Sequence, residues 1–263
     1  MKTKSGRSLP PVAKRQLGWF TRYVRWFLPR NFHGLHLLRL TDLEKLNGSP
    51  LLVCLNHPSW WDPLIALYLS QRFLPDRRHV APMAAASLAK YKFFERLGFF
   101  GIEPHRLRGA SRFLEIGNAV LSQTDGALWV TAQGELTDAR RPVMIEPGVG
   151  HLARRAGRFA MLPVALEYTF WNERYPEAFA CFGDAIVGDG EDRSSAEWNA
   201  LFTKALQTTA DALSRKVQLR CATAFEPLLA GRAGIGGVYD FWRAATARLQ
   251  GKGWQPKHGE DKC

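Results

Sequence analysis

The segment that decides the fold is LLVCLNHPSWWDPLIALYLS, residues 51–70. Its first five residues are all apolar, which predicts a buried strand. The apolar residues at its other end predict a helix with Pro63 in the first turn. His57 therefore lies where a strand of an α/β sheet ends, and Asp62 lies in the first turn of the following helix. Open α/β sheets bind their ligands at this edge, so the segment predicts both the fold class and the place of the site.

His57 and Asp62 have the chemistry of a proton-transfer pair. A neutral imidazole can take a proton from an alcohol, and a carboxylate on its other nitrogen would fix the tautomer and stabilise the imidazolium that forms. The alternative is structural, because Ser59 and Asp62 have the spacing of a capping box, in which Asp62 only accepts backbone N–H groups at the helix start. These residues alone leave both interpretations open.

Four segments, taken in order, resemble the sequence blocks of the glycerophosphate and lysophospholipid acyltransferase family. They are NHPSWWD (56–62), GIEPHR (101–106), QGELT (133–137) and LPVAL (162–166). Their order and spacing are far more specific than any single segment, and the resemblance covers about residues 50 to 170. The third segment departs from the family pattern Pro-Glu-Gly-Thr-Arg-Ser, because Gln133 replaces the glutamate and Leu136 replaces the arginine.

The resemblance implies an enzyme of phospholipid biosynthesis that moves a fatty acyl group from a thioester, on coenzyme A or acyl carrier protein, to a hydroxyl of a lysophospholipid-like lipid. It makes His57 the general base and Asp62 its orienting partner. Substrate binding is expected of Asn56, Ser59, Arg106, Gln133, Gly134 and Glu135. Neither a metal ion nor a nucleotide cofactor is expected. Two alternatives follow from the altered third segment: a glycosylated or amino lipid as acceptor, or a catalytically idle membrane-binding protein of the same fold.

The chain of 263 residues has a net charge of +12 and an isoelectric point near 9.9. Such a charge implies an anionic partner, either nucleic acid or a membrane surface. We find no zinc-finger spacing, RNP-type segment or sustained heptads, so we expect no nucleic-acid partner. The basic residues concentrate at the start of the sequence, where no acidic residue precedes Asp42.

The basic start also has helical periodicity, with Arg22 and Arg25 opposite a face that carries Leu17, Phe20, Val24, Phe27 and Leu28. This pattern predicts an amphipathic helix in a bilayer interface, with its cations near anionic headgroups. The alternative is a helix packed on the protein's own core. No uncharged apolar run approaches the ~20 residues of a spanning helix, and the four cysteines show no metal-ligand spacing. We therefore expect a reduced, peripheral protein at the cytoplasmic face of an anionic membrane.

Alternating predicted strands and helices indicate an α/β fold, a mixed central sheet flanked by helices, preceded by the N-terminal amphipathic interfacial helix. We expect a membrane-interface segment at 1–33, an acyltransferase domain at 34–230, and a C-terminal helix and polar tail at 231–263. The expected strands are 35–40, 51–56, 79–84, 99–102, 127–132, 159–167 and 179–187. The expected helices are 60–71, 87–97, 111–123, 149–156, 195–216 and 238–249.

One further motif is GVGHLA (148–153), which matches a dinucleotide-binding fingerprint. The apolar segment before it is short, and no acidic residue other than Glu167 follows near the expected spacing. We therefore expect these glycines to let a helix pack close to the sheet rather than to bind a nucleotide.

Overall fold

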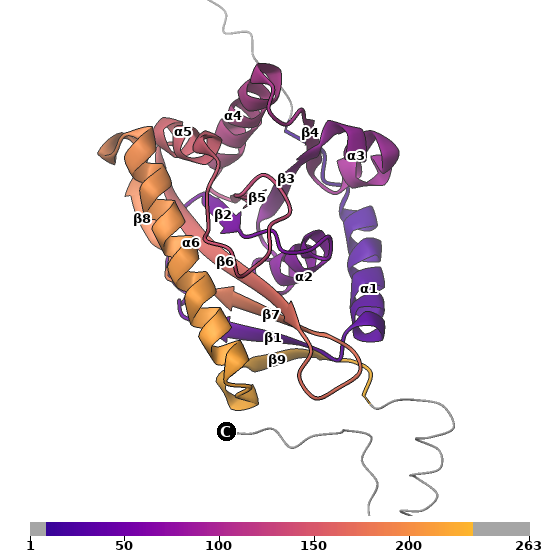
Figure 1. Ribbon diagram of the computed structural model, residues 1–263. Helices are drawn as coiled ribbons and strands as arrows, with labels where there is room; N and C mark the ends of the chain where they lie inside the picture. Colours follow the sequence, from indigo (N-terminus) through magenta and orange to yellow (C-terminus); the bar gives the residue numbers. More distant parts are fainter. Residues whose placement is uncertain (1–8, 234–263) are drawn as a thin grey trace, which may run out of the picture.

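The structure, a computed structural model, describes residues 9–233, and a mixed sheet lies at its centre (Figure 1). In this part of the chain the sheet has nine strands: β1 (Gly34–Arg39), β2 (Leu51–Leu55), β3 (Arg78–Ala84), β4 (Phe99–Ile102), β5 (Gly126–Thr131), β6 (Arg158–Thr169), β7 (Glu177–Phe182), β8 (Ile186–Asp189) and β9 (Glu226–Ala230).

The strand order is β4-β3-β5-β2-β6-β7-β1-β9, and β8 pairs with one end of β6. The five strands from β4 to β6 run parallel to their neighbours. The strand β7 is antiparallel to β6, β1 is parallel to β7, and β9 is antiparallel to β1. The predicted mixed sheet is therefore confirmed, and the carboxyl ends of its parallel strands meet at one edge.

Helices cover both faces of this sheet: α1 (Lys14–Asn31), α2 (Asp62–Phe73), α3 (Ala85–Lys90), α4 (Leu107–Leu121), α5 (Pro147–Arg155) and α6 (Ser195–Gln218). Short 3-10 turns occur at Leu43–Leu46, Lys92–Arg96, Gly190–Asp192 and Ala222–Ala224. The long helix α6 begins with a reciprocal capping box, in which Ser194 and Glu197 each accept the other's backbone N–H.

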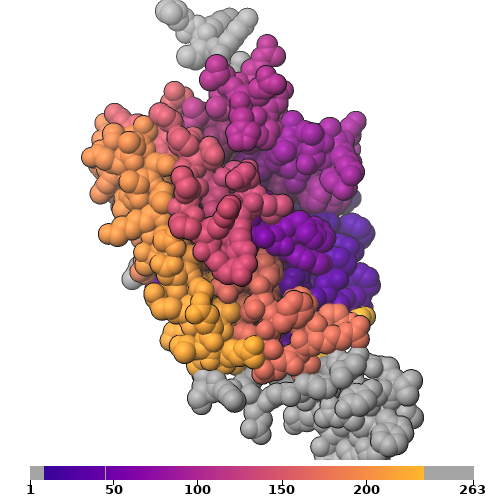
Figure 2. Space-filling view, viewed as in Figure 1, coloured from indigo at the N-terminus to yellow at the C-terminus, as the bar shows by residue number. Residues whose placement is uncertain are grey.

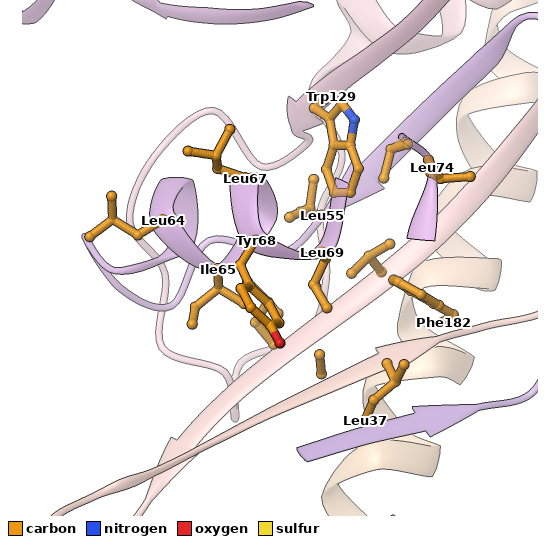
Figure 3. Close-up of a cluster of buried hydrophobic side chains, with 14 of the residues drawn as sticks. Leu37, Leu55, Leu64, Ile65, Leu67, Tyr68, Leu69, Leu74, Trp129 and Phe182 are labelled. Atoms are coloured by element: carbon orange, nitrogen blue, oxygen red, sulfur yellow. The ribbon is translucent and has the colours of Figure 1, made fainter. Parts of the chain in front are cut away.

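Side-chain alternation along β2 divides the core into two layers. Leu51, Val53 and Leu55 point into one cluster with α1 and α2, while Leu52 and Cys54 point into another with α4, α5 and α6. This division follows from the period of two along a strand. Figure 3 shows part of the first cluster, where side chains from α2 pack beside Leu55 and Trp129.

The apolar face of α1 belongs to the first cluster, because Phe20, Val24 and Leu28 are buried and Leu17 and Phe27 pack against them. The interpretation that this apolar stripe enters a bilayer is therefore wrong. The stripe packs on the protein's own core, the alternative that the same periodicity allows. The outer face of α1 remains exposed and carries Trp19, Tyr23 and Trp26 among its arginines.

Several expected elements differ from those observed. The strand expected at 179–187 is two strands, β7 and β8, and the helix expected at 87–97 is α3 followed by a 3-10 turn. The strand β9 was not expected, and the helix expected at 238–249 lies outside the described residues.

Gly150 allows close packing, as predicted, but against α6 rather than the sheet: a Cβ there would lie 2.1 Å from the Ser195 carbonyl oxygen. Cys54 and Cys181 are buried free thiols.

Candidate active site

The carboxyl ends of neighbouring strands bring distant segments of sequence together. The first segment follows β2, the second begins with the last two residues of β4, the third follows β5 and the fourth lies within β6. Because β2 pairs with both β5 and β6, the third and fourth segments flank the first. The segment between β5 and α5 lies across the centre of the face shown in Figure 2.

His57 and Asp62 form a direct hydrogen bond of 2.6 Å between Nδ1 and Oδ2. The Asp62 side chain is 1% exposed, while that of His57 is 19% exposed. The carboxylate therefore accepts the Nδ1–H of the ring, which leaves Nε2 as the nitrogen that can accept a proton. This is the arrangement of a general base with an orienting carboxylate.

Asp62 also fulfils part of the structural role that its spacing predicts. Its Oδ2 accepts the Ser59 backbone N–H at 3.0 Å, which fixes the turn at the start of α2. Its Oδ1 accepts the hydroxyl of Tyr168, from the end of β6, at 2.7 Å. Burial and the neighbouring Asp62 carboxylate both raise the pKa of Tyr168 well above its ordinary value, so the phenol remains a neutral donor. The capping and catalytic interpretations of Asp62 are thus compatible.

The third segment contacts the backbone of His57 on both sides. Gln133 accepts the His57 N–H through Oε1 at 3.3 Å, and Thr137 donates its N–H to the His57 carbonyl at 2.9 Å. Between them, Gly134 has a φ of 75°, and a Cβ there would lie 2.9 Å from Cγ of Glu146. A glycine is favoured at such a position because L side chains rarely adopt this backbone conformation.

The predicted substrate-binding residues fall into two groups. Arg106, Gly134 and Glu135 line a cavity beside His57. Asn56 instead makes a pair of buried hydrogen bonds to the Leu166 backbone, and Ser59 and Gln133 hold the turns around Asp62 and His57. The geometry of this second group supports a role in building the site, and the prediction that it contacts substrate stays a prediction.

The cavity beside His57 has a volume of about 700 Å³ and a mostly apolar wall. Its wall includes Pro63, Ala66, Leu67 and Ser70, which share one face of α2. The span from Asp62 to Ser70 corresponds to about 12 Å of helix at the usual rise per residue. Leu55, Leu67 and Trp129, which also line the cavity, are drawn in Figure 3. The cavity is thus a mostly apolar space beside one face of α2, with the proton-transfer pair at the start of that helix.

His79 and Trp129 form a polar contact in the wall of this cavity. Trp129 donates its indole N–H to Nδ1 of His79 at 3.0 Å, and Nε2 of His79 donates to the Leu74 carbonyl at 2.8 Å. Because Leu74 follows the last residue of α2, this pair lies at the opposite end of the helix from Asp62. Burial lowers the pKa of His79 to about 4, so its ring is neutral and fully hydrogen-bonded at neutral pH.

Acidic side chains outnumber basic ones around the cavity. Among the described lining residues, Arg106 is the only arginine or lysine, whereas exposed carboxylates are contributed by Glu103, Glu135 and Glu146. Arg140 does not add a second cation to the wall, because it lies outside the lining and pairs with Asp138 at 2.6 Å. The Arg140 side chain is also exposed to solvent.

Three features of the candidate site were not predicted from the sequence: Tyr168, Glu146 and the contact between His79 and Trp129. Tyr168 comes two residues after the fourth segment, and the only signal for it was the period of two along β6. Among the described residues no group of three or more histidine, cysteine or acidic side chains could hold a metal ion. Within the same range no helix is both long and apolar enough to cross a membrane.

Comparison with known proteins agrees with this geometry. The family model named Acyltransferase matches residues 30–167, more than half of the chain. The chain is also similar to a solved structure, the 1-acyl-sn-glycerophosphate (LPA) acyltransferase PlsC from Thermotoga maritima. The two share 14% sequence identity and a TM-score of 0.51, over 77% of this chain and 78% of that chain. At this identity the similarity shows the fold alone, and no curated protein matches. The family match over residues that include His57 and Asp62 shows that this chain belongs to the Acyltransferase family.

Proposed function

We propose that the protein transfers a fatty acyl group from an acyl thioester to a hydroxyl of a lysophospholipid-like lipid at a membrane surface. The observation that carries this proposal is the direct hydrogen bond between His57 and Asp62 in the wall of a mostly apolar cavity. The thioester can be carried by coenzyme A or by acyl carrier protein.

The proposed reaction uses His57 as the general base. Nε2 of His57 removes the proton of the acceptor hydroxyl while its oxygen attacks the thioester carbonyl carbon. The carbon–sulfur bond then breaks, and the leaving thiolate takes the proton from the imidazolium. The buried Asp62 carboxylate stabilises the transient positive charge on the ring. Because a thioester is an activated acyl donor, this route requires neither a nucleotide nor a metal ion.

The acyl chain is assigned to the apolar cavity along α2. Removal of its methylene groups from water stabilises the complex by about 0.8 kcal/mol for each buried CH₂. The acceptor hydroxyl then meets the thioester at His57. Arg106 also lines the cavity, and its guanidinium can donate charged hydrogen bonds to an anionic oxygen of either substrate.

The experiment that tests the proposal incubates the purified full chain with a labelled acyl thioester and a panel of lysolipids, and measures ester product. Wild-type protein should form product, and His57→Ala should lose on the order of 10²–10⁴-fold in rate. A folded wild-type protein that forms no ester with any acceptor would favour the alternative, an idle membrane-binding protein of the same fold.

Substitution of Asp62 separates its two roles. Asp62→Asn keeps an oxygen that can accept the Ser59 N–H, but it cannot stabilise an imidazolium. We expect the melting temperature to stay within a few degrees of wild type and the rate to fall about as far as in His57→Ala. Initial rates and thermal melts measure the two effects. Near-normal turnover in this variant would leave Asp62 only its structural role.

Filling the cavity tests where the acyl chain binds. Ala66 lies in the cavity wall on α2, so Ala66→Phe should obstruct long acyl chains while still admitting short ones. We expect kcat/KM to fall about tenfold or more for long-chain thioesters and to change little for short ones. The matched control is Ala200→Phe on the exposed face of α6. Equal losses for all chain lengths would place the acyl chain elsewhere.

The acceptor headgroup is proposed from the charges around the cavity. Three exposed carboxylates and one arginine give a wall that would repel a doubly charged phosphate. The usual arginine of the third segment is Leu136 here, and Arg140 is occupied by Asp138. We therefore expect poor transfer to lysophosphatidic acid or glycerol 3-phosphate, and better transfer to a zwitterionic lysophospholipid, an amino lipid or a glycosylated lipid.

Competition between acceptors at equal concentration measures this preference. The less anionic acceptors should be acylated faster than lysophosphatidic acid, and Glu135→Gln should reduce the difference because it removes one repelling charge. Glu191→Gln, a remote exposed residue with the same change of charge, should leave the preference unchanged. A clear preference of the wild-type protein for lysophosphatidic acid would show that Arg106 alone suffices for phosphate recognition.

The membrane-facing surface is assigned to the outer face of α1. Trp19 and Trp26 are 63% and 51% exposed, and exposed cations accompany them at Lys14, Arg15, Arg22, Arg25 and Arg30. Ring contacts continue from Trp19 through Tyr23, Phe27 and Trp61 to Trp60, and Trp60 lines the cavity. Aromatic rings and cations favour the interface of an anionic bilayer, and the ring contacts join this face to the site.

Vesicle binding tests this surface without truncation, since removal of residues 1–30 would also remove Phe20, Val24 and Leu28 from the core. The double variant Arg22→Gln with Arg25→Gln should weaken binding to anionic vesicles about tenfold or more, and added salt should weaken wild-type binding. The control Arg154→Gln with Arg155→Gln makes the same change of charge at the end of α5. Equal losses in both pairs would contradict the assignment to α1.

A further inference from the structure

Tyr168 lies at the one oxygen of Asp62 that faces neither His57 nor the start of α2. Its hydroxyl donates to Oδ1 at 2.7 Å, while Oδ2 accepts Nδ1 of His57 at 2.6 Å and the Ser59 N–H at 3.0 Å. Tyr168 follows the fourth segment and lies one residue beyond the end of the family match at 167. It therefore belongs to none of the sequence blocks.

The sheet explains why this tyrosine reaches the site. Leu55, at the end of β2, is paired with Val164 of β6. Val164 and Leu166 both point into the core cluster on the α2 side, and the period of two places Tyr168 on that side as well. Its ring packs against Phe32 with the ring centroids 5.8 Å apart. The phenol is thus held in one position by neighbours that do not take part in proton transfer.

A donor on Oδ1 changes how strongly Asp62 attracts a proton. The carboxylate is 1% exposed, so water cannot replace a lost hydrogen bond there. Without the Tyr168 hydroxyl, Oδ1 would be buried and unpaired, and the carboxylate would hold the proton of the His57 imidazolium more strongly. The apparent pKa of His57 would then rise, and less of the free base would exist at a given pH.

We propose that Tyr168 is a positioning residue that acts through Asp62, fixing the orientation of the carboxylate and limiting the proton affinity of His57. The inference rests on the proposed role of His57 as a general base. Tyr168 itself does not contact the reacting atoms, because the Asp62 carboxylate lies between its hydroxyl and the imidazole ring.

Other charged and titratable groups line the cavity that contains this pair: His79, Glu103, His105, Arg106, Glu135 and Glu146. None of them forms a hydrogen bond with Tyr168 in the described structure. They are the same in wild-type protein and in every variant compared below, so a difference between variants reports the hydroxyl of Tyr168.

The decisive variants are Tyr168→Phe and the matched control Tyr68→Phe. Tyr68 is buried and lies on α2, but its hydroxyl donates to the Leu228 carbonyl at 3.2 Å and does not touch Asp62. Each substitution removes one phenol hydrogen bond. NMR titration of the His57 ring in the full chain, assigned by its absence in His57→Ala, gives the first readout. We expect the pKa of His57 to rise by about one unit in Tyr168→Phe and to stay unchanged in Tyr68→Phe.

A second substitution should shift the pKa of His57 in the opposite direction. Site-specific 3-fluorotyrosine at position 168 keeps the shape of the side chain and makes its hydroxyl a stronger donor, so the pKa of His57 should fall below the wild-type value. The proposal is overturned if the His57 titration is the same in all variants, or if Tyr68→Phe shifts it as much as Tyr168→Phe does.

Kinetics provide the readout that a purely structural role would not change. In Tyr168→Phe the acidic limb of the kcat/KM profile should move to higher pH, with kcat lowered about tenfold below the limb and KM nearly unchanged. In an Asp62→Asn background the same substitution should have no further effect, because the two residues act as one unit. A full additional loss in that background would overturn the proposal. If wild-type protein transfers no acyl group, the proposed function fails, while the His57 titration still decides the role of Tyr168.

Discussion

The site depends on one buried carboxylate, that of Asp62, which must keep all its hydrogen-bond donors. Asp62 is almost fully enclosed, and a buried charge without hydrogen bonds is strongly unfavourable. Its three donors come from the end of β2, from the turn before α2 and from the end of β6. The carboxylate can therefore remain charged only when β2 and β6 are in register. The register of β2 and β6 therefore positions the hydrogen-bond donors of Asp62, and the charged Asp62 in turn favours that register.

Sequence analysis identified the parts of the site that are local in the chain. His57 and Asp62 are five residues apart, on either side of a strand-to-helix turn, so strand periodicity and turn chemistry suffice to place them. Tyr168 and Gln133 contact the same turn from 106 and 76 residues away. Those contacts depend on strand order and register, which one sequence does not specify. The mixed sheet could be predicted from the alternation of strands and helices. The strand β9 could not, because it pairs with β1, which is far away in the sequence.

The first helix shows why an apolar stripe does not identify its environment. Phe20, Val24 and Leu28 have the same periodicity whether they face lipid or a protein core, because both environments favour apolar side chains. The structure places them in the core. What distinguishes α1 from an ordinary surface helix is its other face, where exposed tryptophans lie among arginines. An interface between water and lipid favours that combination, and a protein core does not.

The third segment shows how specificity can change while the catalytic geometry stays. Its contacts to His57 use the Thr137 backbone and one side-chain oxygen of Gln133. The amide of Gln133 supplies the same acceptor as the usual glutamate without placing a charge beside the imidazole. The residues of this segment that line the cavity are instead Gly134, Glu135 and Leu136. Because the supporting contacts and the wall use different atoms, substitutions in the wall can alter the acceptor without displacing His57. An altered third segment is therefore consistent with an intact proton-transfer pair.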